Sequence, residues 1–144
     1  MEKEYLYQAE VKWNGEKKGM LVLAGKPDLP VATPPEFGGH EGLTTPEELF
    51  VASAVVCFMS TFLAMGAKTR AEWTDFSCWG EGRLEKAGDR GLLFTRIDLY
   101  PKVTVGDESR IKTVNRALEL SQKYCLVTNS MTTEVVVHPE VLVS

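Results

Sequence analysis

The sequence predicts an α+β protein. Two groups of strand-like segments alternate apolar and polar residues, and one uncharged helical segment separates the groups. The 144 residues are 44% hydrophobic and 25% charged, which is typical of a folded globular chain. A chain of this length fits one domain whose core needs no disulfide or metal, so we expect a single domain over residues 1–144.

The first strand group is expected to be a β-hairpin. Residues 5–13 alternate, with Tyr5, Tyr7 and Trp13 on the apolar side, and Asn14-Gly15 marks a turn before a returning strand at residues 19–24. Residues 25–45 hold four prolines and four glycines. This composition predicts a long loop.

A helix is expected to follow this loop. Thr44 or Thr45 is the hydroxyl cap, Pro46 occupies the first turn, and the helix runs to Met65 with Gly66 as its terminator. The nineteen residues 49–67 carry no charge, which is long enough to span a bilayer. Their hydroxyl and thiol side chains and the strand-like flanks favour instead a soluble protein with this helix buried on all sides, covered in part by a dimer interface.

The remaining elements alternate clearly. Residues 73–86 and 92–105 predict two strands, and Asp107 can cap an amphipathic helix that runs from Ile111 to Cys125. A last strand covers residues 134–143 and is bent at Pro139.

Composition excludes several classes of function. The net charge of −4 and the lack of a basic run argue against nucleic acid as a partner. Eight charges among the first eighteen residues leave no apolar signal segment, and three widely spaced cysteines fit a reducing cytoplasm. The cysteines and histidines form no short ligand pair, and no phosphate-binding loop occurs, so we expect neither metal nor cofactor.

The cysteines are the candidate reactive groups. Cys57 lies inside the uncharged helix, and Cys125 follows sixty-eight residues later at the end of the amphipathic helix. Either one alone is most simply a buried core residue, but a pair on two helices that pack together could be reactive. Cys78 has no cysteine partner at short range and is interpreted as structural.

Two motifs resemble the OsmC/Ohr family of osmotically inducible and organic hydroperoxide resistance proteins. These are PEELFVAS at residues 46–53 with Cys57-Phe58 on the helix, and YCLVTNS at residues 124–130; Phe37-Gly38-Gly39 resembles one branch of the family. The resemblance covers nearly the whole chain. It implies an intertwined cytoplasmic homodimer in which antiparallel sheets surround two long buried central helices.

The resemblance also implies a cofactor-free peroxidase. Cys57 would attack an organic hydroperoxide and become a sulfenic acid, Cys125 would resolve it as a disulfide, and an external dithiol would reduce that disulfide. Phe50, Phe58 and Phe62 would suit an apolar substituent on the peroxide.

Glu47 matches the acidic position of the family. It precedes Cys57 by ten residues, about 15 Å of straight helix, so a shared site requires contact between subunits or a break in the helix. Otherwise Glu47 only favours the start of the helix, by about 0.3–1 kcal/mol.

One departure concerns the cation of the family site. Family members use an arginine from the segment before the helix, whereas every arginine here follows it. The candidates to replace it are Lys12, Lys17, Lys18, Lys26 and His40. The alternatives to a peroxidase are a protein that binds a small apolar ligand at the dimer interface and a thiol sensor that is oxidised without turnover.

Overall fold

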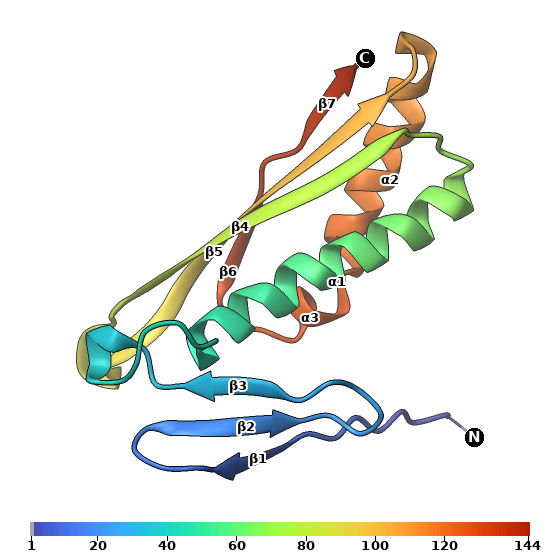
Figure 1. Ribbon diagram of the computed structural model, residues 1–144. Helices are drawn as coiled ribbons and strands as arrows, with labels where there is room; N and C mark the ends of the chain where they lie inside the picture. Colours follow the sequence, from blue (N-terminus) through green and yellow to red (C-terminus); the bar gives the residue numbers. More distant parts are fainter. Residues whose placement is uncertain (1) are drawn as a thin grey trace. The chain divides into compact units, whose positions relative to one another are not determined.

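The computed structural model describes residues 2–144, which fold as two compact units (Figure 1). Of the described residues, the first unit comprises residues 2–50 and the second residues 51–144. The long helix α1 (Pro46–Thr69) begins in the first unit and continues in the second.

The first unit contains a three-stranded antiparallel sheet. Its strands β1 (Glu10–Trp13), β2 (Lys18–Val22) and β3 (Leu29–Ala32) lie in the order β1-β2-β3. The predicted hairpin is confirmed, because β1 pairs with β2 across a turn in which Gly15 and Glu16 have positive φ.

Two parts of the first unit differ from expectation. Residues 5–9 lie outside β1, so the first strand is shorter than its alternation predicts. The expected loop at residues 25–45 contains β3 and a short 3₁₀ helix, η1 (Pro35–Phe37). Pro30 is tolerated in β3 because that strand lies at the edge of the sheet, where a missing N–H breaks no ladder.

The chain folds back on itself directly after η1. The N–H of His40 donates to the Thr33 carbonyl at 2.9 Å, and a Cβ on Gly39 would collide with that same carbonyl oxygen. Only glycine fits at this close approach.

Thr45 and Glu48 form a capping box at the start of α1. The N–H of Glu48 donates to the Thr45 hydroxyl at 3.1 Å, and the N–H of Thr45 donates to the Glu48 carboxylate at 3.0 Å. The predicted helix start is therefore confirmed.

The predicted end of this helix is wrong, because the helix passes through Gly66 to Thr69. Gly66 is buried under Trp73, where a Cβ would lie 2.6 Å from the indole ring. Arg70 takes the positive φ of 59° that ends the helix, and the N–H of Ala71 donates to the Gly66 carbonyl at 2.8 Å.

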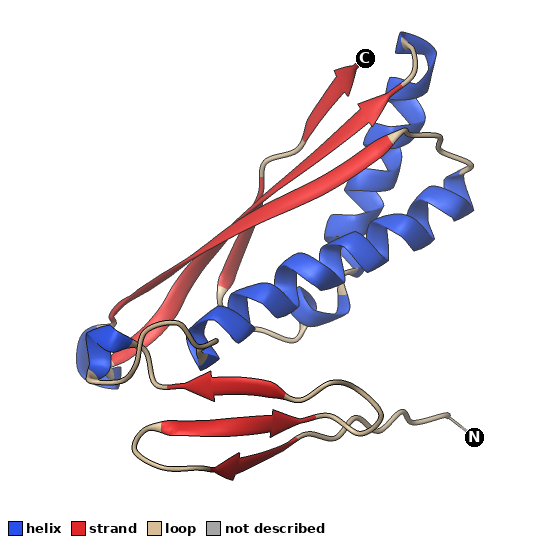
Figure 2. Ribbon diagram, in the orientation of Figure 1, coloured by secondary structure: helices blue, strands red, loops and turns tan. Residues whose placement is uncertain are grey.

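A mixed sheet organises the second unit (Figure 2). Strand β4 (Asp75–Lys86) pairs antiparallel with β5 (Leu92–Val105), and the short helix η2 (Gly88–Arg90) connects them. Strands β6 (Glu134–Val137) and β7 (Glu140–Val143) both pair with β5 in parallel. Pro139 lies between them, as the predicted bend requires.

The expectation of purely antiparallel sheets is therefore corrected for this sheet. Between β5 and β6 the chain forms η3 (Glu108–Arg110), α2 (Ile111–Tyr124) and α3 (Leu126–Asn129). A helical connection of this length returns the chain to the end of the sheet where β5 began, which permits parallel pairing. Asp107 caps η3 by accepting a hydrogen bond from the N–H of Ser109 at 2.8 Å.

The core of the second unit lies between the sheet and the helices. Alternate residues of β5 are fully buried, and so are Phe58 and Phe62 of α1 and Val114 and Leu118 of α2. Figure 1 shows α2 and α1 on one face of this sheet.

The helix α1 is not buried on all sides in the single chain. Val56, Met59 and Leu63 lie on one stripe and are 56%, 40% and 44% exposed. By length and composition α1 could cross a membrane, but the same is true of core helices in soluble proteins, and 28% of its most apolar stretch is already buried. The expectation that a second copy covers this stripe stays a prediction.

Candidate active site: a pair of cysteine thiols

The candidate site lies at the junction between α2 and α3. Cys125 ends α2 because its backbone becomes extended, with φ −64° and ψ 112°. The chain then starts α3 at Leu126. The first N–H groups of a helix have no acceptor within that helix, so those of Leu126 and Val127 are available to a neighbouring group.

Cys57 supplies the acceptor for these donors. The N–H of Val127 donates to the Cys57 sulfur at 3.5 Å, and the Leu126 N–H and the Cys125 thiol lie near enough to it to lower the pKa of Cys57. The Thr61 hydroxyl lies 3.8 Å from the same sulfur and donates to the Cys57 carbonyl at 2.8 Å. Two cysteines sixty-eight residues apart are thus brought together.

These contacts act on the pKa of Cys57 in opposite directions. Burial raises the pKa of the thiol, because a thiolate loses solvation in the interior. The hydrogen bonds from Val127, Cys125, Thr61 and Leu126 outweigh this effect and hold the pKa below its ordinary value. The arrangement therefore favours the thiolate, which is the nucleophilic form.

The two thiols differ in their exposure to solvent. Both are free, but Cys57 is half-buried whereas Cys125 is fully buried. A reagent that enters from solvent therefore meets Cys57 first. Phe58 and Phe62, expected to line this site, are instead packed in the core and are not available to a ligand in the single chain.

Glu47 lies at the start of α1, ten residues before Cys57. Because α1 is continuous, helix geometry separates the two positions by about 15 Å along its axis. One carboxylate oxygen of Glu47 is buried and has no hydrogen-bond partner among the described residues. A buried acceptor without a partner is costly, so this oxygen is a candidate for contact with a molecule outside the chain.

The cationic candidates before α1 lie in the first unit. Lys17 and Lys18 lie beside an apolar groove of about 460 Å³, and Lys18 forms an ion pair with Glu16 at 3.2 Å. His40 accepts a hydrogen bond from the Lys17 N–H at 3.4 Å. Lys12 and Lys26 are exposed.

Cys78 occupies a different environment on β4. Burial raises the pKa of its thiol to about 11; a backbone hydrogen bond with Tyr100 opposes this increase, and electrostatic interaction with Cys125 adds to it. A thiol that stays protonated at neutral pH is unreactive, which agrees with a structural role. Among residues 2–144, no group of three metal-binding side chains comes together.

Sequence reasoning singled out both cysteines of the pair but missed the hydrogen-bond donors around Cys57. Two of these are backbone N–H groups, which have no side-chain signature, and the helix break at Cys125 contains neither glycine nor proline. Thr61 could have been found, because it lies one helical turn after Cys57.

Two sheets, a long helix and two neighbouring thiols define a mixed α+β protein with a candidate two-cysteine site. The family model of OsmC-like proteins matches residues 38–140, and the chain belongs to this family. No curated protein is similar enough in sequence to match the chain.

Solved structures share the fold. An OsmC-like protein of unknown function from Vibrio cholerae is 23% identical with a TM-score of 0.85, over 94% of this chain and 99% of that chain. An organic hydroperoxide resistance protein from Legionella pneumophila is 24% identical with a TM-score of 0.74, over 96% and 99%. The organic hydroperoxide resistance protein of Bacillus subtilis is 20% identical with a TM-score of 0.67, over 95% and 99%.

Proposed function

We propose that the protein is a thiol-dependent peroxidase that reduces organic hydroperoxides. The observation that carries this proposal is the hydrogen bond from the Val127 N–H to the Cys57 sulfur, beside Cys125, which together with other donors holds the pKa of Cys57 low. Two of the structural neighbours are organic hydroperoxide resistance proteins, which supports the choice of substrate class.

The first step is attack by the Cys57 thiolate on the outer oxygen of the hydroperoxide. The O–O bond breaks, the sulfur becomes a sulfenic acid, and the alkoxide takes a proton and leaves as an alcohol. Half-burial of Cys57 admits the peroxide, while the Val127 and Leu126 N–H groups stabilise the negative charge before attack.

The second step is resolution by Cys125. Its thiol condenses with the sulfenic acid, a disulfide forms, and water leaves. Cys125 lies near enough to Cys57 to act on its pKa, which supports its choice as the resolving thiol. An external dithiol then reduces the disulfide by thiol–disulfide exchange, as a reducing cytoplasm allows.

The proposal includes a homodimer. The exposed apolar stripe of α1 and the exposed side chains of β1, Val11 and Trp13, would be covered by a second copy. Glu47 would then assist at the site of the partner, since ten residues of helix separate it from Cys57 of its own chain.

The test is consumption of cumene hydroperoxide with dithiothreitol as the dithiol. Wild-type protein is expected to turn over repeatedly and Cys57→Ser to be inactive. Cys125→Ser treated with the peroxide in the absence of dithiothreitol is expected to stop as a sulfenic acid detectable by dimedone labelling, whereas wild type forms the disulfide. Cys78→Ser is the matched control and should retain turnover. Consumption no faster than in the Cys57→Ser sample would reject the proposal.

A second candidate function is binding of a small apolar ligand without turnover. The apolar groove of the first unit supports it, since Val11, Leu21, Val31 and Leu49 line a space of about 460 Å³. Native mass spectrometry that recovers a bound apolar molecule from protein inert to cumene hydroperoxide would favour this function.

A further inference from the structure

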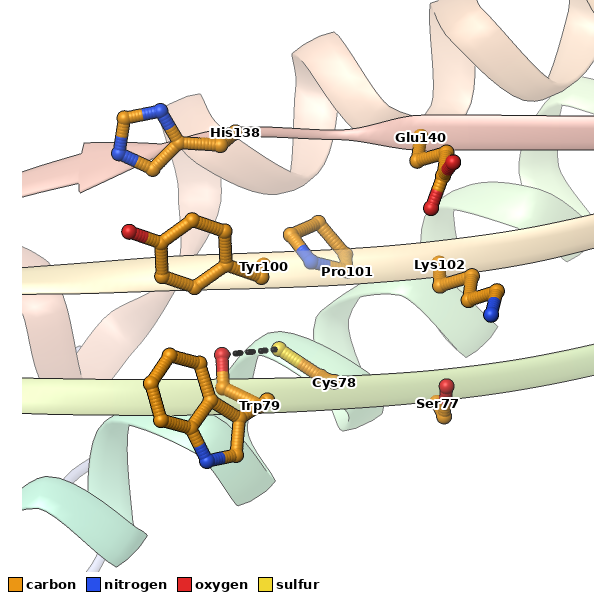
Figure 3. A pocket seen from close by; sticks show the side chains of 8 residues that line it. All are labelled: Ser77, Cys78, Trp79, Tyr100, Pro101, Lys102, His138 and Glu140. Carbon is orange, nitrogen blue, oxygen red and sulfur yellow. Dashed lines mark hydrogen bonds between the residues drawn. The ribbon is translucent and has the colours of Figure 1, made fainter.

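The outer face of the mixed sheet carries a second pocket, on the side away from the helices (Figure 3). Residues that alternate with the buried ones of β4 and β5 point outward here, and the space between them is about 450 Å³. It is lined by two rows of side chains that cross the strands, over a floor formed by Cys78 and Pro101.

The first row is aromatic. Trp79, Tyr100 and His138 come from three adjacent segments, with ring centroids 5.3 Å apart between Trp79 and Tyr100 and 4.7 Å apart between Tyr100 and His138. Trp79 is 60% exposed and Tyr100 38% exposed. Two large exposed rings side by side form a contiguous apolar surface, which is the kind of patch that marks a binding site.

Hydrogen bonds hold this row in place. The N–H of His138 donates to the Leu99 carbonyl at 2.8 Å, and the His138 ring lies 2.8 Å from the Asp98 carboxylate. The guanidinium of Arg96 and then His138 lower the pKa of Asp98 to about 2, so its carboxylate is charged at neutral pH. The aromatic row is therefore formed before any ligand arrives.

The second row is polar. Ser77, Lys102 and Glu140 lie two residues further along their strands, and the register pairs Lys102 with both of the others. Among the described residues neither Lys102 nor Glu140 makes an ion pair, although they are neighbours of opposite charge. One cation and one anion thus remain available beside an aromatic wall.

We propose that this pocket binds a free aromatic α-amino acid. The ring packs on Trp79 and Tyr100, the α-ammonium group pairs with Glu140, and the α-carboxylate pairs with Lys102. The two rows are two residues apart along the strands, which is roughly 6.6 Å. This spacing matches the length of an aromatic amino acid from its ring, across Cβ and Cα, to its two charged groups. The pocket lies on the opposite face of the sheet from α1 and α2, so this proposal is independent of the peroxidase proposal.

Charge complementarity selects this ligand over its relatives. A ligand with a ring and only one charge leaves either Lys102 or Glu140 unpaired, and glycine leaves the aromatic row uncovered. The natural probe is L-phenylalanine, because each analogue removes one part of it: phenethylamine lacks the carboxylate, 3-phenylpropionate lacks the ammonium, and glycine lacks the ring.

The experiment is isothermal titration of the full-length protein with these four compounds. L-phenylalanine should bind saturably, and each analogue at least about fivefold more weakly. Glu140→Gln should weaken the binding of L-phenylalanine by a similar factor and leave the affinity for 3-phenylpropionate unchanged. Lys102→Gln should leave the affinity for phenethylamine unchanged. Lys112→Gln on α2 is the matched surface control.

Trp79→Ala should abolish L-phenylalanine binding. If this variant does not fold, Glu140→Gln and Lys102→Gln still test the proposal, because they change only exposed charges. The proposal is overturned if L-phenylalanine binds no better than 3-phenylpropionate and phenethylamine, or if Glu140→Gln and Lys102→Gln bind it like wild type.

Discussion

At Cys57, burial and hydrogen bonding act on one thiol in opposite directions, and the hydrogen bonds prevail. The donors include backbone N–H groups freed by the helix break at Cys125 as well as side chains, so the lowered pKa of Cys57 depends on local folding around Cys125. The cysteines themselves could be found from the sequence, because a family motif surrounds each of them. The Leu126 and Val127 donors could not, since any residue except proline presents the same N–H group.

The Thr61 hydroxyl offers a direct test of this balance. Thr61→Val removes the hydroxyl near the Cys57 sulfur while preserving shape, so the pKa of Cys57 should rise. At neutral pH, alkylation of Cys57 by iodoacetamide should slow by about two- to threefold, since less thiolate is present.

Thr69→Val is the matched control for this substitution. Thr69 lies on the same helix and donates its hydroxyl to the Met65 carbonyl at 2.8 Å, four residues back, as Thr61 does to Cys57. Mass spectrometry of the alkylated peptides over a pH series gives the pKa of Cys57 in each variant. Equal pKa values of Cys57 in wild type and Thr61→Val would show that the Thr61 hydroxyl does not lower this pKa.

Cys78 predicts a loss of stability at alkaline pH. Its pKa is about 11 in the folded protein and 9.0 in an ordinary environment, so between these values the unfolded chain releases a proton that the folded chain keeps. The free energy of unfolding should therefore fall as pH rises from 9 to 11.

Urea unfolding followed by circular dichroism across this pH range measures the effect. Cys78→Ala should show a shallower decline than wild type, because it lacks the titrating group. Parallel slopes in the two proteins would mean that the Cys78 thiol ionises as readily in the fold as in the unfolded chain.

At the scale of helices and strands, a prediction from the sequence agrees with the structure where local sequence alone determines the element. β4 and β5 were predicted within two residues because their alternation is long and their inner face is buried. The sequence does not predict β3, because Pro30 and the prolines on either side of the strand favour a loop and only pairing with β2 makes this segment a strand. The end of α1 was misplaced because the burial of Gly66 under Trp73 depends on a tertiary contact.

Close packing between α1 and β4 gives a prediction at this scale. A Cβ on Gly80 would lie 2.5 Å from a methyl group of Val55 and 3.1 Å from one of Leu99. Gly80→Ala should lower the free energy of unfolding by about 1–3 kcal/mol, as overpacked core substitutions do.

Gly106→Ala is the control, because a Cβ there meets no atom within 4 Å. Val55→Ala removes the obstructing methyl group, so the double variant Gly80→Ala/Val55→Ala should lose less stability than the sum of the single variants. Additive losses in urea unfolding would show that the helix shifts freely to accept the extra carbon.

For the whole molecule, the fold class followed from the sequence because it requires only the order of the elements. The sequence does not predict what packs against α1, since an uncharged helix is compatible with a core, an interface or a bilayer. The single chain buries one face of α1 with Ala54, Phe58 and Phe62 and leaves Val56, Met59 and Leu63 exposed. An apolar stripe on a helix of this length is the surface that a second copy would bury in the proposed homodimer.

Charge placed on this stripe should break the assembly. Met59→Glu would bury an unpaired carboxylate in the proposed interface, at a cost of several kcal/mol, so the protein should sediment as a monomer at concentrations where wild type is a dimer. Lys112→Glu on the polar side of α2 is the control and should stay dimeric. The monomer should also lose peroxide turnover while Cys57 still forms a sulfenic acid more slowly, because Glu47 would no longer reach the partner's site. Wild-type protein that sediments as a monomer at all concentrations would exclude this assembly and any role of Glu47 across subunits.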